Sequence, residues 1–130
     1  SAATAVVRRV ILDSGTWAAG TAAGRFVVNG QVGNFVAENL HVGASLNLAT
    51  VAGNSSAITL AAGGHVEATN HNFYGASNLN RMYFADGVSK AHEWDGTVAV
   101  PITTGMAVDT PSHVQAHKKH LFLSFSGGSH

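Results

Sequence analysis

Three histidines near the end of the sequence have a spacing that could bind a metal ion. His113, His117 and His120 are four and three residues apart, which on a helix would place their imidazoles on one face, as in a zinc site. The surrounding residues instead favour two short strands joined by a turn at Lys118-Lys119. Such a hairpin would bring His117 and His120 together, but the two strands themselves contain no carboxylate or cysteine to complete a ligand set. We therefore predict turn-flanking histidines and no metal site.

Four acidic residues of the second half could supply the carboxylate pair of a glycoside hydrolase: Asp86, Glu93, Asp95 and Asp109. Asp86 and Asp95 precede glycine and Asp109 precedes Thr-Pro, so these three side chains are expected to hold turns. Glu93 lies within a predicted strand, where it could act as a general acid or base. Motifs of the G-x-S-x-G, P-loop and G-x-G-x-x-G kinds do not occur in the sequence. We predict no enzymatic activity, no catalytic residue and no cofactor.

Four aromatic residues could form a platform for stacking sugar rings: Trp17, Tyr74, Tyr83 and Trp94. Such residues more often fill cores, so we assign them to core or strand-edge positions. The triplet Asn54-Ser55-Ser56 fits the acceptor pattern for N-linked glycosylation, which also arises frequently by chance.

The composition excludes several classes of function. Charged residues make up 11% of the 130 residues, against roughly 25% in typical soluble domains, and the formal net charge is zero. Electrostatic capture of nucleic acid or of an anionic membrane is therefore not expected. The chain has no cysteine, which excludes disulfides and thiolate metal sites. No apolar run approaches the roughly 20 residues of a membrane helix, and the first residues do not resemble a signal peptide.

The second half of the chain consists of short apolar runs separated by turn signals. The predicted strands cover residues 65–74, Arg81–Ala85, 91–94, 98–102, His113–His117 and 120–125. Asp86-Gly87 and Asp95-Gly96 are strong turn signals between successive runs. Strands at this close, regular spacing predict an antiparallel meander, the unit of a sandwich or of a propeller blade.

The first half is rich in alanine, valine and glycine. Its runs predict five strands, at residues 6–12, 25–28, 34–42, 46–51 and 57–60. Asn29-Gly30 is the strongest short hairpin signal in the chain. A helix over residues 34–48 is the main alternative because alanine, glutamate and leucine favour helices, but Gly43 and three asparagines weigh against it. We predict an all-β protein with a small β-barrel or sandwich module at 1–63 and meander strands at 64–130, divided at Gly63-Gly64.

Motifs in both halves resemble those of tailed-bacteriophage virion proteins. In the second half the similar segments are Asn70-His71-Asn72-Phe73-Tyr74-Gly75, Arg81-Met82-Tyr83, Asp86-Gly87-Val88, His92-Glu93-Trp94-Asp95-Gly96-Thr97, Pro101-Ile102-Thr103-Thr104-Gly105 and His117-Lys118-Lys119-His120-Leu121-Phe122. Upstream, Gly33-Asn34-Phe35 and Glu38-Asn39-Leu40-His41-Val42-Gly43 are similar to a small β module inserted in such chains. The resemblance implies that residues 64–130 form partial blades of a β-propeller, as in the tail nozzle proteins of short-tailed phages.

The resemblance also implies a structural role in a phage tail or head-to-tail assembly, located in the virion. One or two blades cannot bury both faces of their sheets, so the chain is expected to be part of a longer propeller protein. The expected partners are other virion proteins and copies of the chain, without membrane, specific nucleic-acid or small-molecule binding. A carbohydrate-binding or adhesion module using Trp17, Trp94 and the tyrosines is the first alternative. A hydrolase propeller with Glu93 as acid or base is the second.

Overall fold

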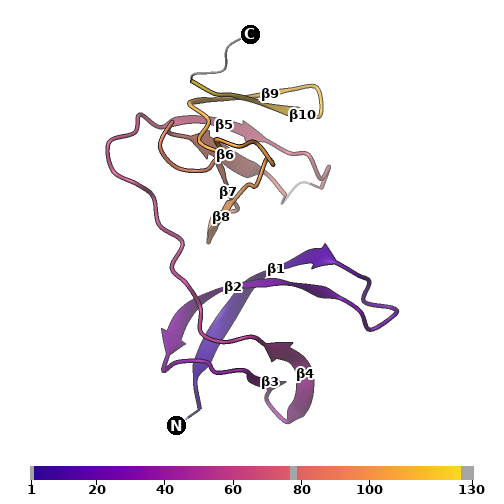
Figure 1. The fold of residues 1–130 in the computed structure, drawn as a ribbon. Coiled ribbons are helices and arrows are strands. Elements are labelled where there is room, and N and C mark those ends of the chain that lie inside the picture. The colour runs from indigo at the N-terminus through magenta and orange to yellow at the C-terminus, as the bar shows by residue number, and fades with distance from the viewer. Residues whose placement is uncertain (1, 77–78, 127–130) are drawn as a thin grey trace. The chain divides into compact units, whose positions relative to one another are not determined.

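A computed structural model describes residues 2–76 and 79–126 of the chain. These residues form ten strands and no helix, so the all-β class predicted from the sequence is confirmed. The chain divides into two compact units, one ending at Ala57 and the other beginning at Ile58 (Figure 1). The sequence pattern placed this division at Gly63-Gly64.

The first unit contains two antiparallel hairpins rather than a five-stranded module. Its strands are β1 (Thr4–Ser14), β2 (Ala23–Val32), β3 (Glu38–Val42) and β4 (Ser45–Val51). β1 pairs with β2, and β3 pairs with β4. The strand predicted at residues 57–60 does not form, and these residues pair with no other strand. The next residue, Ala61, donates its backbone N–H to Ser89 Oγ at 2.9 Å instead.

Asn29-Gly30 lies inside β2, and the hairpin turn predicted there is wrong. Thr4 is opposite Val32 and Val6 is opposite Asn29, so two residues of β2 face a single residue of β1. Gly30 has a φ of 61°, the left-handed conformation that glycine adopts at a β-bulge without steric cost. The dipeptide thus produces a bulge, because β1 is long enough to continue pairing on both sides of it.

The connections of the first unit follow other local signals. Between β1 and β2, Gly20 N–H donates to Trp17 O at 3.1 Å and Thr21 N–H donates to Thr16 O at 3.2 Å. Between β3 and β4 the turn contains only Gly43, with a φ of 57°, and the alanine after it. These two strands replace the helix considered as the alternative for residues 34–48.

The second unit is built on a four-stranded antiparallel sheet, which we call the core sheet. Its strands are β5 (Glu67–His71), β6 (Arg81–Ala85), β7 (His92–Trp94) and β8 (Ala99–Pro101). Each strand pairs with the next one in sequence, so the predicted meander is confirmed. Gly87 and Gly96 have φ values of 77° and 96°, as their Asp-Gly turns require.

A further hairpin, β9 (His113–His117) and β10 (His120–Ser124), packs against one face of the core sheet. In Figure 1 β9 lies beside β5 in the same unit. Lys118 and Lys119 have φ values of 50° and 53°, which matches a two-residue type I′ turn. This hairpin is the one that the sequence predicts.

The apolar core of the second unit lies between the core sheet and this hairpin. Its most buried members are Tyr83, Ala85, Ala91 and Val114. Around them pack the half-buried side chains of Phe73, Ile102, Leu121 and Leu123. The Phe73 ring meets the Tyr83 ring edge-on, with 5.2 Å between the centroids. Because strand residues alternate between faces, the side chains of β6 that flank Tyr83 in sequence point to the opposite side of the sheet.

Ala85 provides a direct test of this packing, because its side chain is 0% exposed. We expect Ala85→Leu to lower the free energy of unfolding by about 1–3 kcal/mol, since extra methylenes must displace the hairpin. Ala68→Leu, on the exposed side of the neighbouring strand β5, is the matched control and should stay within about 0.5 kcal/mol of wild type. Urea denaturation of both variants measures the difference, and equal midpoints would contradict the packing described.

Candidate functional site

The core sheet brings an arginine, a glutamate and two tyrosines together, and we call these four residues the polar cluster. Glu93 of β7 is directly opposite Tyr83 of β6, and Arg81 is two residues from Tyr83 and therefore on the same face. Arg81 Nε lies 3.5 Å from Glu93 Oε1, and both side chains are only 14% exposed. The Tyr74 hydroxyl donates to Glu93 Oε2 at 3.4 Å, and the Arg81 guanidinium lies 5.5 Å from the centre of the Tyr74 ring.

The electrostatics of the polar cluster are those of a structural ion pair. Burial raises the pKa of Tyr83, and the nearby Glu93 carboxylate and Tyr74 hydroxyl raise it further, so the phenol stays protonated. Arg81 Nε is buried and makes no hydrogen bond, so its attraction to Glu93 is electrostatic across 3.5 Å. Arg81 thus compensates the half-buried charge of Glu93, which would otherwise be costly to desolvate.

Two of the remaining acidic residues hold turns, as the sequence predicts. Asp86 Oδ1 accepts hydrogen bonds from the backbone N–H groups of Val88 at 3.0 Å and Ser89 at 2.6 Å. Asp95 Oδ1 accepts from Thr97 N–H at 2.9 Å and from Val98 N–H at 3.0 Å. These side chains supply turn acceptors that the backbone itself lacks at these positions.

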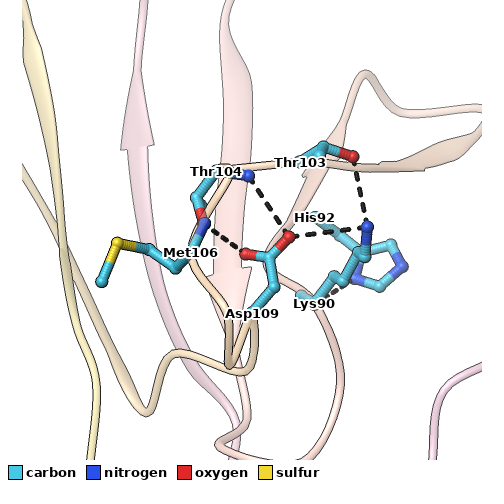
Figure 2. A network of polar contacts seen from close by, with 6 residues as sticks. All are labelled: Lys90, His92, Thr103, Thr104, Met106 and Asp109. Carbon is cyan, nitrogen blue, oxygen red and sulfur yellow. Dashed lines mark hydrogen bonds and ion pairs between the residues drawn. The ribbon is translucent and has the colours of Figure 1, made fainter. Parts of the chain in front are cut away.

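Asp109 closes the loop of residues 103–110, in the network that Figure 2 shows. Its carboxylate accepts from Thr104 N–H at 3.2 Å and from Thr104 Oγ1 at 2.5 Å. Lys90 Nζ lies 3.5 Å from Asp109 Oδ2 and donates to Thr103 Oγ1 at 3.2 Å. The hydrogen bond from the Thr104 hydroxyl lowers the pKa of Asp109, which favours its charged form. We call Lys90, Thr103, Thr104 and Asp109 the loop clamp.

His92 is a buried titratable group, with 2% of its surface exposed. Its ring stacks on Phe84 with 5.1 Å between centroids and 9° between planes. Nδ1 lies 2.8 Å from the Lys90 carbonyl oxygen, which fits the neutral tautomer that carries its hydrogen on Nδ1. Burial lowers the pKa of His92 and outweighs the opposing effects of this hydrogen bond and of the nearby negative Asp86.

The three histidines considered as zinc ligands lie at the two ends of the β9–β10 hairpin. His117 and His120 face each other beside the lysine turn, as predicted. His113 is at the far end, opposite Ser124, and its Nδ1 lies 2.8 Å from Glu67 Oε2 of β5. Within residues 2–76 and 79–126, no three histidine or acidic side chains gather where they could hold a metal ion.

The four aromatic residues assigned to core or strand-edge positions divide into two kinds. Tyr83 is 3% exposed, whereas Trp17, Tyr74 and Trp94 are 65%, 58% and 40% exposed, so only Tyr83 of the four lies in the core. Trp94 is opposite Met82, on the other face of the core sheet from Tyr83 and the polar cluster. Tyr74 and Trp94 therefore lie on opposite sides of one sheet and do not form a shared platform for a sugar. All three exposed rings lie in turns or at a strand end, where the core cannot cover them.

Asn54, the asparagine of the glycosylation triplet, joins two loops of the first unit. Its Oδ1 accepts from Gln31 Nε2 at 2.6 Å and from Phe35 N–H at 3.3 Å. Its Nδ2, the atom that would carry a glycan, donates to Asn34 Oδ1 at 3.3 Å. The side chain thus has a structural role in this unit.

The polar cluster and the loop clamp are absent from the predictions made on the sequence. Arg81 and Glu93 meet only because β6 and β7 pair in one particular register, and Lys90 meets Asp109 only because the loop after β8 folds back. The one available signal was a charged residue, Glu93, in the middle of a predicted strand. This signal indicated the position of Glu93 in the polar cluster but did not indicate which residues would contact it.

Comparison of the chain with protein-family models, with curated proteins and with solved structures found no match. Among the described residues there is also no helix of the length and apolarity needed to cross a bilayer. Function is therefore inferred from the geometry above and from the motif resemblance.

The burial of His92 predicts a specific pH dependence of stability. Because its pKa is lower in the folded than in the unfolded chain, folding is favoured above the unfolded value of about 6.5 and weakens as the pH falls through it. We expect the melting temperature to decrease between pH 7.5 and pH 5. His92→Phe, which keeps an aromatic ring against Phe84, should flatten this decrease, whereas His120→Phe at an exposed position should retain it. An unchanged slope in His92→Phe would contradict the assignment.

Proposed function

We propose that the chain is a structural component of a bacteriophage tail or head-to-tail assembly, acting through contacts with other virion proteins and with copies of itself. The observation that carries the proposal is the packing of hairpin β9–β10 face-on against the four-stranded meander β5–β8. In a β-propeller, four-stranded antiparallel blades follow one another in sequence around a central axis. On this proposal, the core sheet is one blade, and β9 and β10 are the first strands of the next.

The placement of the resembling motifs supports this role. Asp86-Gly87 and Asp95-Gly96 form the turns of the core sheet, and His117-Lys118-Lys119-His120 forms the turn of the following hairpin. The motifs therefore coincide with the joints of the meander rather than with a pocket. Such a pattern fits a structural protein, which acts through its shape and its contacts with other proteins.

The surface of the first unit is suited to protein contacts. Val7, Val10, Leu12 and Phe26 share one face of the β1–β2 hairpin and are between 37% and 48% exposed. Val27 is the one buried hydrophobic residue among the described residues of this unit. Patches of this kind mark interaction sites. With 11% charged residues and zero net charge, partners can cover them without burying many unpaired ions.

The acidic side chains support a role without catalysis. Glu93 is compensated by Arg81, and Asp86, Asp95 and Asp109 are engaged in turns or in the loop clamp. A general acid or base needs a pKa near the working pH and access to a substrate proton. Hydrogen bonds instead hold the pKa of Asp86 and Asp109 below their usual range, against the effect of burial.

Immunogold electron microscopy tests the proposed location. An antibody raised against this chain should label the tails of phage particles produced from the genome that encodes it. Antibody first absorbed with the purified chain is the control and should leave the particles unlabelled. Antigen found only in the unassembled fraction of the lysate would contradict a virion role.

A carbohydrate-binding or adhesion module is the second candidate, favoured by the exposure of Trp17 and Trp94. An exposed indole can stack on the apolar face of a sugar ring. If this candidate is right, a glycan array should detect binding that Trp17→Ala or Trp94→Ala abolishes. Absence of any glycan bound by the wild-type chain would exclude it.

A further inference from the structure

His117 and His120 are exposed histidines on either side of the turn of the β9–β10 hairpin. They are directly opposite each other in the register of the two strands. Side chains at directly opposite positions share one face, and their Cβ atoms are about 4.5–5.5 Å apart. Among the described residues neither imidazole makes a hydrogen bond or an ion pair, and the ring of His120 only approaches that of Phe122, at 6.2 Å between centroids. The ring nitrogens are therefore available to a ligand.

The hairpin holds this pair of histidines on a rigid base. Lys118 and Lys119 form the two-residue type I′ turn, which fixes the register of the two strands. Leu121, the residue after His120, packs against the core of the second unit. Because strand residues alternate between faces, His117 and His120 point away from that core and toward solvent. Little backbone freedom is lost when a ligand joins the two rings, so more of the contact energy appears as affinity.

Two imidazoles at this separation can bind one divalent transition-metal ion. Neutral imidazole nitrogen is a good ligand for copper, nickel and zinc, and its bonds to zinc are about 2.0–2.1 Å long. Bonds of this length to neighbouring positions on one ion require nitrogens about 3 Å apart, which rotation of both rings about their side-chain bonds can supply. Calcium and magnesium prefer oxygen ligands, and neither strand of the hairpin contains a carboxylate.

We infer that His117 and His120 form a two-ligand site for a divalent transition metal, with Cu²⁺ bound more tightly than Ni²⁺ or Zn²⁺. Nitrogen sites generally prefer copper, whose square arrangement accepts two neighbouring nitrogens and two waters. Because water fills the remaining positions, the site needs no carboxylate or cysteine. It differs from the three-histidine zinc site considered on the sequence, since His113 lies at the other end of the hairpin and is bonded to Glu67. The site goes beyond the proposed structural role and does not depend on it.

Calorimetric titration of the full chain with CuCl₂, without an affinity tag, tests this site. His117→Gln and His120→Gln should each weaken the tightest binding event by about tenfold or more, because the second imidazole binds intramolecularly once the first is in place. His113→Gln, on the same strand and the same face, is the matched control and should bind Cu²⁺ as the wild type does. Equal weakening in His113→Gln, or unchanged binding in either of the other two variants, would overturn the inference.

Electron paramagnetic resonance of the Cu²⁺ complex provides a second measurement that needs no variant to fold. Each coordinating imidazole nitrogen splits the copper signal further, so the splitting pattern reports how many nitrogens are bound. With equimolar Cu²⁺ we expect the two-nitrogen pattern in the wild type and the one-nitrogen pattern in His117→Gln. A one-nitrogen pattern in the wild type would refute the paired site. An equal amount of Zn²⁺ should leave most of the copper signal in place, and its loss would contradict the expected order of affinities.

Discussion

The packing of hairpin β9–β10 against β6 is the interaction on which the second unit depends. Tyr83 and Ala85 on one side and Val114 on the other close a core that the core sheet cannot form alone. Two backbone hydrogen bonds hold the segment before the hairpin in place: Gly87 N–H donates to Pro111 O, and Ser112 N–H donates to Ser124 O, both at 2.8 Å. A single four-stranded sheet exposes two faces to water, and this contact covers one of them.

The polar groups of the second unit are arranged around this core with few unpaired charges. Glu93 would be costly so near Tyr83 without Arg81, and His92 is accommodated as a neutral ring between Phe84 and the Lys90 carbonyl. The Asx turns at Asp86 and Asp95 supply acceptors for backbone N–H groups at the tight joints. Polar side chains in this unit thus stabilise its shape.

The first unit lacks an apolar core of this kind. Its hairpins bury little apolar surface, and the apolar face of β1–β2 remains exposed. Small domains have little core to offset the loss of chain entropy, so a partner that covers this face would add directly to stability. The low charge of the chain is consistent with surfaces that are covered in an assembly.

Local chemistry in the sequence determined the fold class, the meander of the second half and its turns. Asp-Gly dipeptides and the Lys118-Lys119 pair form turns because the necessary hydrogen bonds and φ values involve only neighbouring residues. Asn29-Gly30 carries the same kind of signal but forms a bulge, because the outcome there depends on how far β1 extends beside it. The ion pair of Arg81 with Glu93, the contact of Lys90 with Asp109 and the exposure of Trp94 were decided by the tertiary structure alone. Each depends on strand register or on which face is covered, and these are set by residues distant in sequence.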